Sequence, residues 1–213
     1  KPSFAFAYYL DNQKAEQERG ITIACNTKEF YTERYHYTII DAPGHRDFIK
    51  NMITGSSQAD VALLLCPADG GSFIASIAKG DHKTGEVPGQ TRNHARLLNL
   101  LGIKQLIVGI NKMDSSVDNE TYSEKRFIEI STEVKRILLQ EGWKKDQIEK
   151  EIPILPLAGF HGENLLKSSD KMPWWKGVTV HDPTTKKDIK VSCLLDALND
   201  MVNLPPRNTE GAL

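Results

Sequence analysis

The stretch Asp41-Ala42-Pro43-Gly44-His45 has the residue types of a phosphate and metal site. It directly follows the β-branched and aromatic run 35–40, which predicts a buried strand ending in a carboxylate and a tight loop. Open α/β sheets bind their ligands at such strand ends. We interpret Asp41 as holding Mg²⁺ through water, Gly44 as donating a backbone N–H to a terminal phosphate, and His45 as lying beside the attacked phosphorus. For this short motif alone, an ordinary turn stays an open alternative.

A second motif, Asn111-Lys112-Met113-Asp114, follows the apolar run 106–110. A carboxylate can accept two parallel hydrogen bonds from the N1–H and 2-amino groups of guanine, and adenine offers no such pair of donors. We therefore expect Asp114 to select guanine. The stem of Lys112 would lie over the base, and the amide of Asn111 would tie neighbouring loops together. A polar turn is the alternative, but two such motifs that both end predicted strands make coincidence a poor explanation.

Thr22 is a candidate for a third part of the same site. A hydroxyl in a mobile segment before the Asp41 strand could ligate Mg²⁺ only when a third phosphate is present, so the segment would distinguish a triphosphate from a diphosphate. Considered alone, Thr22 also fits an ordinary strand residue, because threonine is common in strands.

The elements that must position these residues alternate along the chain. Apolar runs at 61–66 and 106–110 predict buried strands, the first of them buried on both faces, and 154–157 predicts a short strand. The segments 21–31 and 35–40 predict an antiparallel hairpin. Helical periodicity or helix-end signals mark five segments, which are 3–18, 46–57, 90–101, 124–140 and 194–202. This order predicts an α/β fold with a mostly parallel sheet and helices on both faces.

Composition limits the class of protein. The 213 residues fit one domain, and 27 basic against 28 acidic residues give no overall bias toward nucleic acid or membrane surfaces. No apolar run approaches the length of a membrane span. The three cysteines (Cys25, Cys66 and Cys193) are widely separated, which favours free thiols in a reducing compartment, and we expect the cytoplasm.

Other residues that can do chemistry fit structural roles better. His94, His161 and His181 share no metal-ligand spacing, so we expect surface or satisfied polar roles for them. Trp174-Trp175 lies between lysines and could stack on RNA bases, but packing of a long loop is the favoured interpretation. The stretch 80–85 is expected to be an exposed loop.

These motifs resemble the GTP-binding domain of the translation elongation factor 1-alpha family and of the related elongation-factor-like proteins. The resemblance rests on Arg19-Gly20-Ile21-Thr22-Ile23, on the uninterrupted stretch from Asp41 to Gly55, and on Asn111-Lys112-Met113-Asp114. It extends over essentially the whole chain. The segments 80–89 and 171–177 resemble the elongation-factor-like branch more than the main one.

The resemblance implies a GTPase of the P-loop NTPase-like G-domain fold that carries aminoacyl-tRNA to the ribosomal A site and is recharged by a guanine-nucleotide exchange factor. His45 would orient the attacking water. Thr22 and Asp41 would hold Mg²⁺, and Asn111, Lys112 and Asp114 would read the guanine of GTP or GDP. Residues 1–203 would form the GTP-binding domain, and 204–213 a linker to a β-barrel domain.

The sequence departs from the family at two places. The phosphate-loop pattern Gly-x-x-x-x-Gly-Lys-Ser/Thr occurs nowhere in it; in the family, this loop and the strand before it lie upstream of the opening segment. Because that loop supplies backbone N–H groups, a lysine and a Mg²⁺ ligand, we expect the chain by itself to bind GTP poorly or not at all. The stretch Ala158-Gly159-Phe160 stands where the family usually has Ser-Gly-Trp or Ser-Ala. Its backbone would still read the guanine O6, but without the serine hydroxyl.

Three alternatives stay open. Two lie within the same fold, a termination or ribosome-rescue GTPase and the GTPase subunit of sulfate activation. The stretch from Asp41 to Gly55 together with Ile21-Thr22-Ile23 favours the elongation factor over both. The third alternative is a non-catalytic binding module, which the lack of a phosphate loop supports.

The role of Asp114 leads to a test in the complete protein. Asp114→Asn is expected to shift base preference from GTP toward XTP, because the amide reverses one donor–acceptor pair. Competition of the two nucleotides for one site measures this shift. An unchanged base preference would contradict the role assigned to Asp114.

Overall fold

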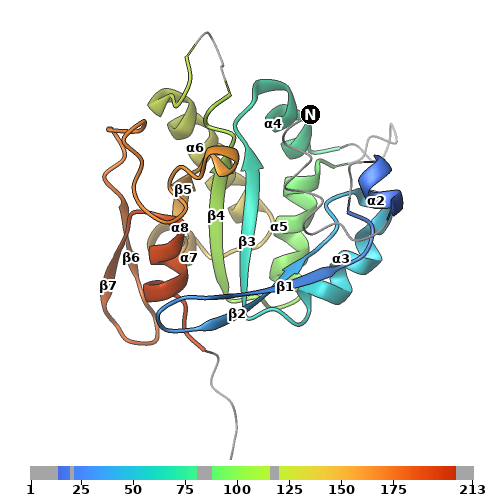
Figure 1. Ribbon diagram of the computed structural model, residues 1–213, viewed down its shortest axis with the longest axis horizontal. Helices are drawn as coiled ribbons and strands as arrows, with labels where there is room; N and C mark the ends of the chain where they lie inside the picture. Colours follow the sequence, from blue (N-terminus) through green and yellow to red (C-terminus); the bar gives the residue numbers. More distant parts are fainter. Residues whose placement is uncertain (1–13, 20–21, 81–87, 116–119, 205–213) are drawn as a thin grey trace, which may run out of the picture.

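A three-stranded parallel sheet forms the centre of the protein (Figure 1). The computed structural model describes residues 14–19, 22–80, 88–115 and 120–204. The strands are ordered β3 (Val61–Pro67), β4 (Gln105–Asn111) and β5 (Ile154–Pro156). In the register, Pro67 lies opposite Asn111, and Ile110 lies opposite Pro156, so the carboxyl ends of all three strands meet at one edge.

The remaining elements of the described chain surround this sheet. Short helices and 3₁₀ turns precede or connect its strands: α2 (Lys14–Arg19), η1 (Arg46–Phe48), α3 (Ile49–Ser56), α4 (Gly70–Ile77), α7 (Lys145–Lys150) and η2 (Gly159–His161). Two longer helices are α5 (Gln90–Leu100) and α6 (Glu124–Gln140). The last helical segment is α8 (Leu194–Asp196) with the π-helical η3 (Ala197–Met201). Two antiparallel hairpins complete the fold, β1 (Asn26–Tyr31) with β2 (His36–Asp41) and β6 (Val178–His181) with β7 (Asp188–Val191).

Strand β4 separates two apolar clusters. Its side chains alternate between the two faces of the sheet, because successive residues of a strand point in opposite directions. Leu106, Val108 and Ile110 pack in the cluster that includes residues of α5 and α6, whereas Ile107 packs with η3 and the β6–β7 hairpin. The predicted α/β fold, with a parallel sheet and helices on both faces, is therefore confirmed.

The hairpin of β1 and β2 is also confirmed, but it starts at Asn26 rather than near residue 21. The prediction of a buried strand before Asp41 is wrong, since β2 is partly exposed along its length and Ile39 is 40% exposed. The reason is that, among the described strands, β2 pairs with β1 and not with the parallel sheet. In Figure 1 the hairpin runs across the view instead of alongside β3. The Tyr37 hydroxyl anchors it by donating to the Leu198 carbonyl at 2.6 Å.

Strand β3 is buried on one face and open on the other. Leu64 and Cys66 lie in the core, but Leu63 and Leu65 are 41% and 49% exposed, so the prediction of burial on both faces is wrong. β3 is the edge strand of its sheet, and η3 with the β6–β7 hairpin covers the part of this face that β4 and β5 form.

The longer helices match the sequence-based predictions. Helix α6 spans Glu124–Gln140 as expected and begins at Ser123, whose hydroxyl accepts from the Arg126 N–H. Helix α5 ends near Gly102, which has φ +79° and stops the helix. The segment 46–57 forms η1 and α3, and 194–202 forms α8 and η3. Of the predicted helix 3–18, only 14–18 lies within the described residues; most of 80–85 and residues 205–213 also lie outside them.

Two elements were missed in the sequence. Helix α4 begins at Asp69, whose carboxylate accepts from the Ser72 N–H at 2.8 Å, a capping signal hidden in a glycine-rich stretch. The β6–β7 hairpin lies in a stretch for which the sequence predicts a long loop. The predicted packing role of the tryptophan pair is confirmed, because both rings contact Phe127, and Trp174 and Trp175 donate to backbone carbonyls.

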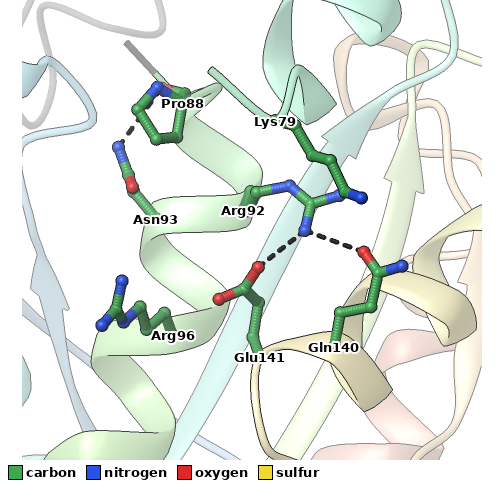
Figure 2. Close-up of a pocket in the computed structure, with 7 residues that line it drawn as sticks. All are labelled: Lys79, Pro88, Arg92, Asn93, Arg96, Gln140 and Glu141. Atoms are coloured by element: carbon green, nitrogen blue, oxygen red, sulfur yellow. Dashed lines mark hydrogen bonds and ion pairs between the residues drawn. The ribbon is translucent and has the colours of Figure 1, made fainter. Parts of the chain in front are cut away.

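A buried ion pair joins α5 to the end of α6 (Figure 2). The Arg92 guanidinium lies between the two helices and donates to Glu141 at 2.7 Å, to Gln140 at 3.0 Å and to the Ile77 carbonyl at 3.3 Å. Both charged side chains are largely enclosed, and both line a cleft of about 400 Å³. One guanidinium thus connects α4, α5 and α6.

This ion pair gives a stability test. Glu141→Ala is expected to lower the free energy of unfolding by about 3–5 kcal/mol, because it leaves the Arg92 charge buried without its partner. Glu141→Gln is expected to cost less, since its amide oxygen can still accept from Arg92. Urea denaturation measures both.

The matched control is Glu149→Ala, which removes an exposed ion pair with Lys145 on α7. Such pairs contribute about 0–1 kcal/mol. Equal losses for the alanine variants at 141 and 149 would contradict a structural role for the buried pair.

Candidate functional site

Three loops meet at the carboxyl edge of the parallel sheet, and Asn111 holds them together. Its side-chain oxygen accepts from the Gly159 N–H at 2.9 Å, and its backbone carbonyl accepts from the Ala68 N–H at 2.7 Å. The Met113 N–H donates to the Leu157 carbonyl at 3.1 Å. The hydrogen bond from Gly159 is the contact between loops that was predicted for the Asn111 amide. It brings the 111–114 motif next to Ala158, Gly159 and Phe160.

Lys112 lies on the rim of this region in a left-handed backbone conformation, with φ +64°. Its ammonium group contacts the Asp69 carboxylate at 3.0 Å. Burial raises the pKa of Asp69, but the hydrogen bonds from Ser72 and Lys112 outweigh it and hold the pKa below its ordinary value. Asp69 was not a sequence candidate. It both caps α4 and holds the Lys112 ammonium group.

Asp114 presents a carboxylate that is partly open to solvent. Its side chain is 26% exposed, and its Oδ2 atom lies 3.6 Å from the Nε2 atom of His161. In the neighbouring loop after β5, Ala158 is fully buried, while Phe160 is exposed and contacts the His161 ring edge-on. The Asp114 carboxylate is therefore accessible beside a short turn of the chain.

The loop from Asp41 to His45 belongs to a separate network. The His45 ring lies 3.5 Å from the Asp47 carboxylate, with its Nδ1 atom accepting from the Asp47 N–H at 3.3 Å. These contacts leave the ring 42% exposed. The His45 ring contacts Asp47 and Phe48 of the neighbouring turn, whereas the contacts of Asn111 run to the loops after β3 and β5. The predicted site residues at 41–45 and at 111–114 therefore follow strands of two different sheets, because β2 lies outside the parallel sheet.

The segment that follows Thr22 is fixed by a buried carboxylate. Glu16 of α2 accepts from the N–H groups of Ile23 at 2.9 Å and Ala24 at 3.0 Å, and its side chain is fully buried. Asn51 of α3 donates to the Ile23 carbonyl at 2.7 Å. Neither Glu16 nor Asn51 was a sequence candidate. They connect the candidate metal-sensing segment to the helices on either side of it.

Cys25 lies where this segment meets Asp41. Its thiol donates to the Asn51 carbonyl at 2.9 Å and lies so close to Gly55 that a Cβ there would stand 2.5 Å from the sulfur. Burial, with a smaller contribution from the Asp41 charge, raises the pKa of the thiol. The thiol is thus kept neutral beside Asp41, and Gly55 allows α3 to approach.

His94 is the residue that sequence reasoning misjudged most. An ideal Cβ at Gly44 would stand 4.0 Å from its Cε1 atom, and its buried Nε2 atom has no hydrogen-bond partner among the described residues. The prediction of a surface or satisfied role is therefore wrong. Helical spacing could have found it, because His94 shares a face of α5 with the buried Thr91 and Leu98.

The comparisons agree with this geometry. The family model described as the elongation factor Tu GTP-binding domain matches residues 3–204. Elongation factor 1-alpha of Plasmodium falciparum is 50% identical over 84% of this chain and 37% of its own length. Elongation factor 1-alpha of Coccidioides immitis is 47% identical over the whole chain and 42% of its own length. The chain thus spans less than half the length of these curated relatives.

Solved structures resemble it as well. The structure of sup35 complexed with GDP has a TM-score of 0.59 and 27% identity, and covers 82% of this chain and 34% of its own. The structure of sup35 complexed with GMPPNP has a TM-score of 0.60 at the same identity, covering 83% and 35%. In the part of the chain that the structure describes, no helix is both long enough and apolar enough to cross a membrane.

The partly buried imidazole of His94 gives a pH test. Burial lowers the pKa of His94, so the unfolded chain takes up this proton at a higher pH than the folded chain does. The contribution of His94 to stability is therefore present above the ordinary histidine pKa and is lost as pH falls below it. We expect His94→Leu to reduce the fall in unfolding free energy between pH 7 and pH 5.

Urea denaturation at pH 7, 6 and 5 measures this difference. At pH 7 the variant is expected to stay within about 1.5 kcal/mol of the parent chain, because an apolar side chain of similar size replaces an unpaired polar ring. Parallel pH profiles of the two proteins would contradict the burial of a neutral His94.

Proposed function

The chain belongs to the elongation factor Tu GTP-binding domain family, and from this we propose that the intact protein is a translational GTPase that delivers aminoacyl-tRNA to the ribosomal A site. Hydrolysis of GTP to GDP and phosphate would act as its switch. The relatives named elongation factor 1-alpha support the ribosome, aminoacyl-tRNA and a guanine-nucleotide exchange factor as partners. The placement in the elongation-factor-like branch stays a prediction from the sequence.

The observation that carries the proposal is the network around Asn111. The hydrogen bond from Gly159 to its side chain brings the Asp114 carboxylate and the loop at 158–160 to the same edge of the sheet. A base lying there could donate its N1–H and 2-amino groups to Asp114. A nearby backbone N–H, such as that of Phe160, could donate to the guanine O6. Adenine lacks the matching donors, so the arrangement supports guanine specificity.

The Asp41 loop would act on the phosphates. Gly44 is exposed and has no side chain of its own, which suits donation of its backbone N–H to a terminal phosphate. The exposed His45 ring could orient a water molecule toward the phosphorus. Positioning of this kind, together with hydrogen bonds to the developing charge, accounts for most catalysis of phosphoryl transfer.

The donor set suits Mg²⁺. Asp41 offers a carboxylate and Thr22 a hydroxyl, and Mg²⁺ prefers oxygen ligands and usually binds through one or two carboxylates, substrate phosphates and water. The described residues contain no cluster of three histidine, cysteine or acidic side chains that could hold a metal by itself. This fits an ion that is shared with nucleotide phosphates. When bound, Mg²⁺ would neutralise charge on them.

Titration with a fluorescent GDP tests the proposal. We expect the intact protein, with a phosphate loop upstream of this chain, to bind GDP tightly and in a Mg²⁺-dependent way, because that loop supplies the backbone donors for the phosphates. This chain alone is expected to bind weakly or not at all. Fluorescent ADP is the control for base recognition.

The outcomes separate the two classes of function. Equal binding of GDP and ADP would contradict the guanine site. Absence of binding by the intact protein would overturn the GTPase proposal and favour the non-catalytic binding module.

A further inference from the structure

His161 lies beside the carboxylate on which guanine recognition depends. Its Nε2 atom is 3.6 Å from the Asp114 Oδ2 atom, and both side chains reach solvent. This distance is too long for a formed hydrogen bond but is within the range of an ion pair. Any positive charge on His161 would therefore act directly on Asp114.

The turn around His161 holds the ring in place. The His161 N–H donates to the Ala158 carbonyl at 3.0 Å, and Gly162 ends the turn with φ +75°. The Phe160 ring contacts the imidazole edge-on, with centroids 5.0 Å apart. The imidazole thus approaches Asp114 from a short, hydrogen-bonded segment.

The other charged side chains near His161 and Asp114 already form ion pairs with other residues. Glu163, which also feels the His161 charge, binds Lys171 at 2.8 Å and is hydrogen-bonded to Ser169. Lys112 is paired with Asp69. Within the described residues, His161 is therefore the cationic partner that the structure gives to Asp114.

Guanine and a charged His161 would compete for the same Asp114 carboxylate. Two parallel hydrogen bonds from the base need both Asp114 oxygens to be open, whereas an imidazolium would pair with one of these oxygens and offset the negative charge. Histidine is the side chain whose charge ordinarily changes between pH 5 and 8. Competition between the two would therefore depend on pH.

We propose that His161 is a further residue of the base-recognition site, which pairs with Asp114 when protonated and so weakens guanine-nucleotide binding as pH falls. This inference rests on the proposed function. It gives the exchange of GDP a dependence on pH that a neutral side chain at this position would not produce.

The test is the affinity of the intact protein for fluorescent GDP at pH 8 and pH 6. From the strength of exposed ion pairs, we expect the affinity to fall about three- to fivefold at the lower pH. His161→Asn is expected to abolish this fall. His161→Arg, which keeps a permanent charge, is expected to bind about three- to fivefold more weakly at both pH values.

The matched control is His181→Asn. His181 is also exposed and also paired with a carboxylate, at 2.9 Å from Asp188, but it lies in the β6–β7 hairpin. This variant is expected to keep the pH dependence of the parent protein.

The results test the role of His161 separately from guanine-nucleotide binding itself. An equal pH dependence in the parent protein and His161→Asn, or unweakened binding by His161→Arg, would overturn the role of His161 while leaving guanine recognition intact. Failure of the parent protein to bind GDP at pH 8 would contradict the proposed function and the inference with it.

Discussion

The hydrogen-bonded pairing of β4 with β3 and β5 is the constraint on which the rest of the structure depends. β4 is enclosed on both faces, so its register with its neighbours cannot slip without moving core side chains into water. That register sets the carboxyl ends of three strands side by side. Asn111 can therefore reach both Ala68 and Gly159, and the loops that follow the strands form one surface.

Ion pairs then fix the positions of side chains on this surface. Asp69 fixes Lys112 while capping α4, and His161 approaches Asp114 from the turn after β5. Each interaction joins a residue of the 111–114 motif to another strand-end loop. Because these side chains are partly exposed, their ion pairs contribute little to overall stability. Their effect is on the position and charge of groups that would meet a base.

The position of the loop from Asp41 to His45 depends on other contacts. Its strand is held by β1 and by the contact of Tyr37 with Leu198, outside the parallel ladder. The exposed leucines of β3 mark the face of the sheet that the described elements leave uncovered. Strand β2 lies against α3 instead, where Gly55 leaves room for Ile40 and Cys25. The two motifs therefore follow strands of two different sheets.

The sequence alone determined the α/β class, the bounds of α6 and the β1–β2 hairpin, because periodicity and caps are local properties. It was wrong about the burial of β2 and β3, because burial depends on which segments cover a strand. The contacts of Asp69 with Lys112 and of Gly159 with Asn111 join residues 43 and 48 positions apart. Only the tertiary structure decided these contacts, together with the placement of His94 and His161, since distances between remote segments follow from packing and not from spacing along the chain.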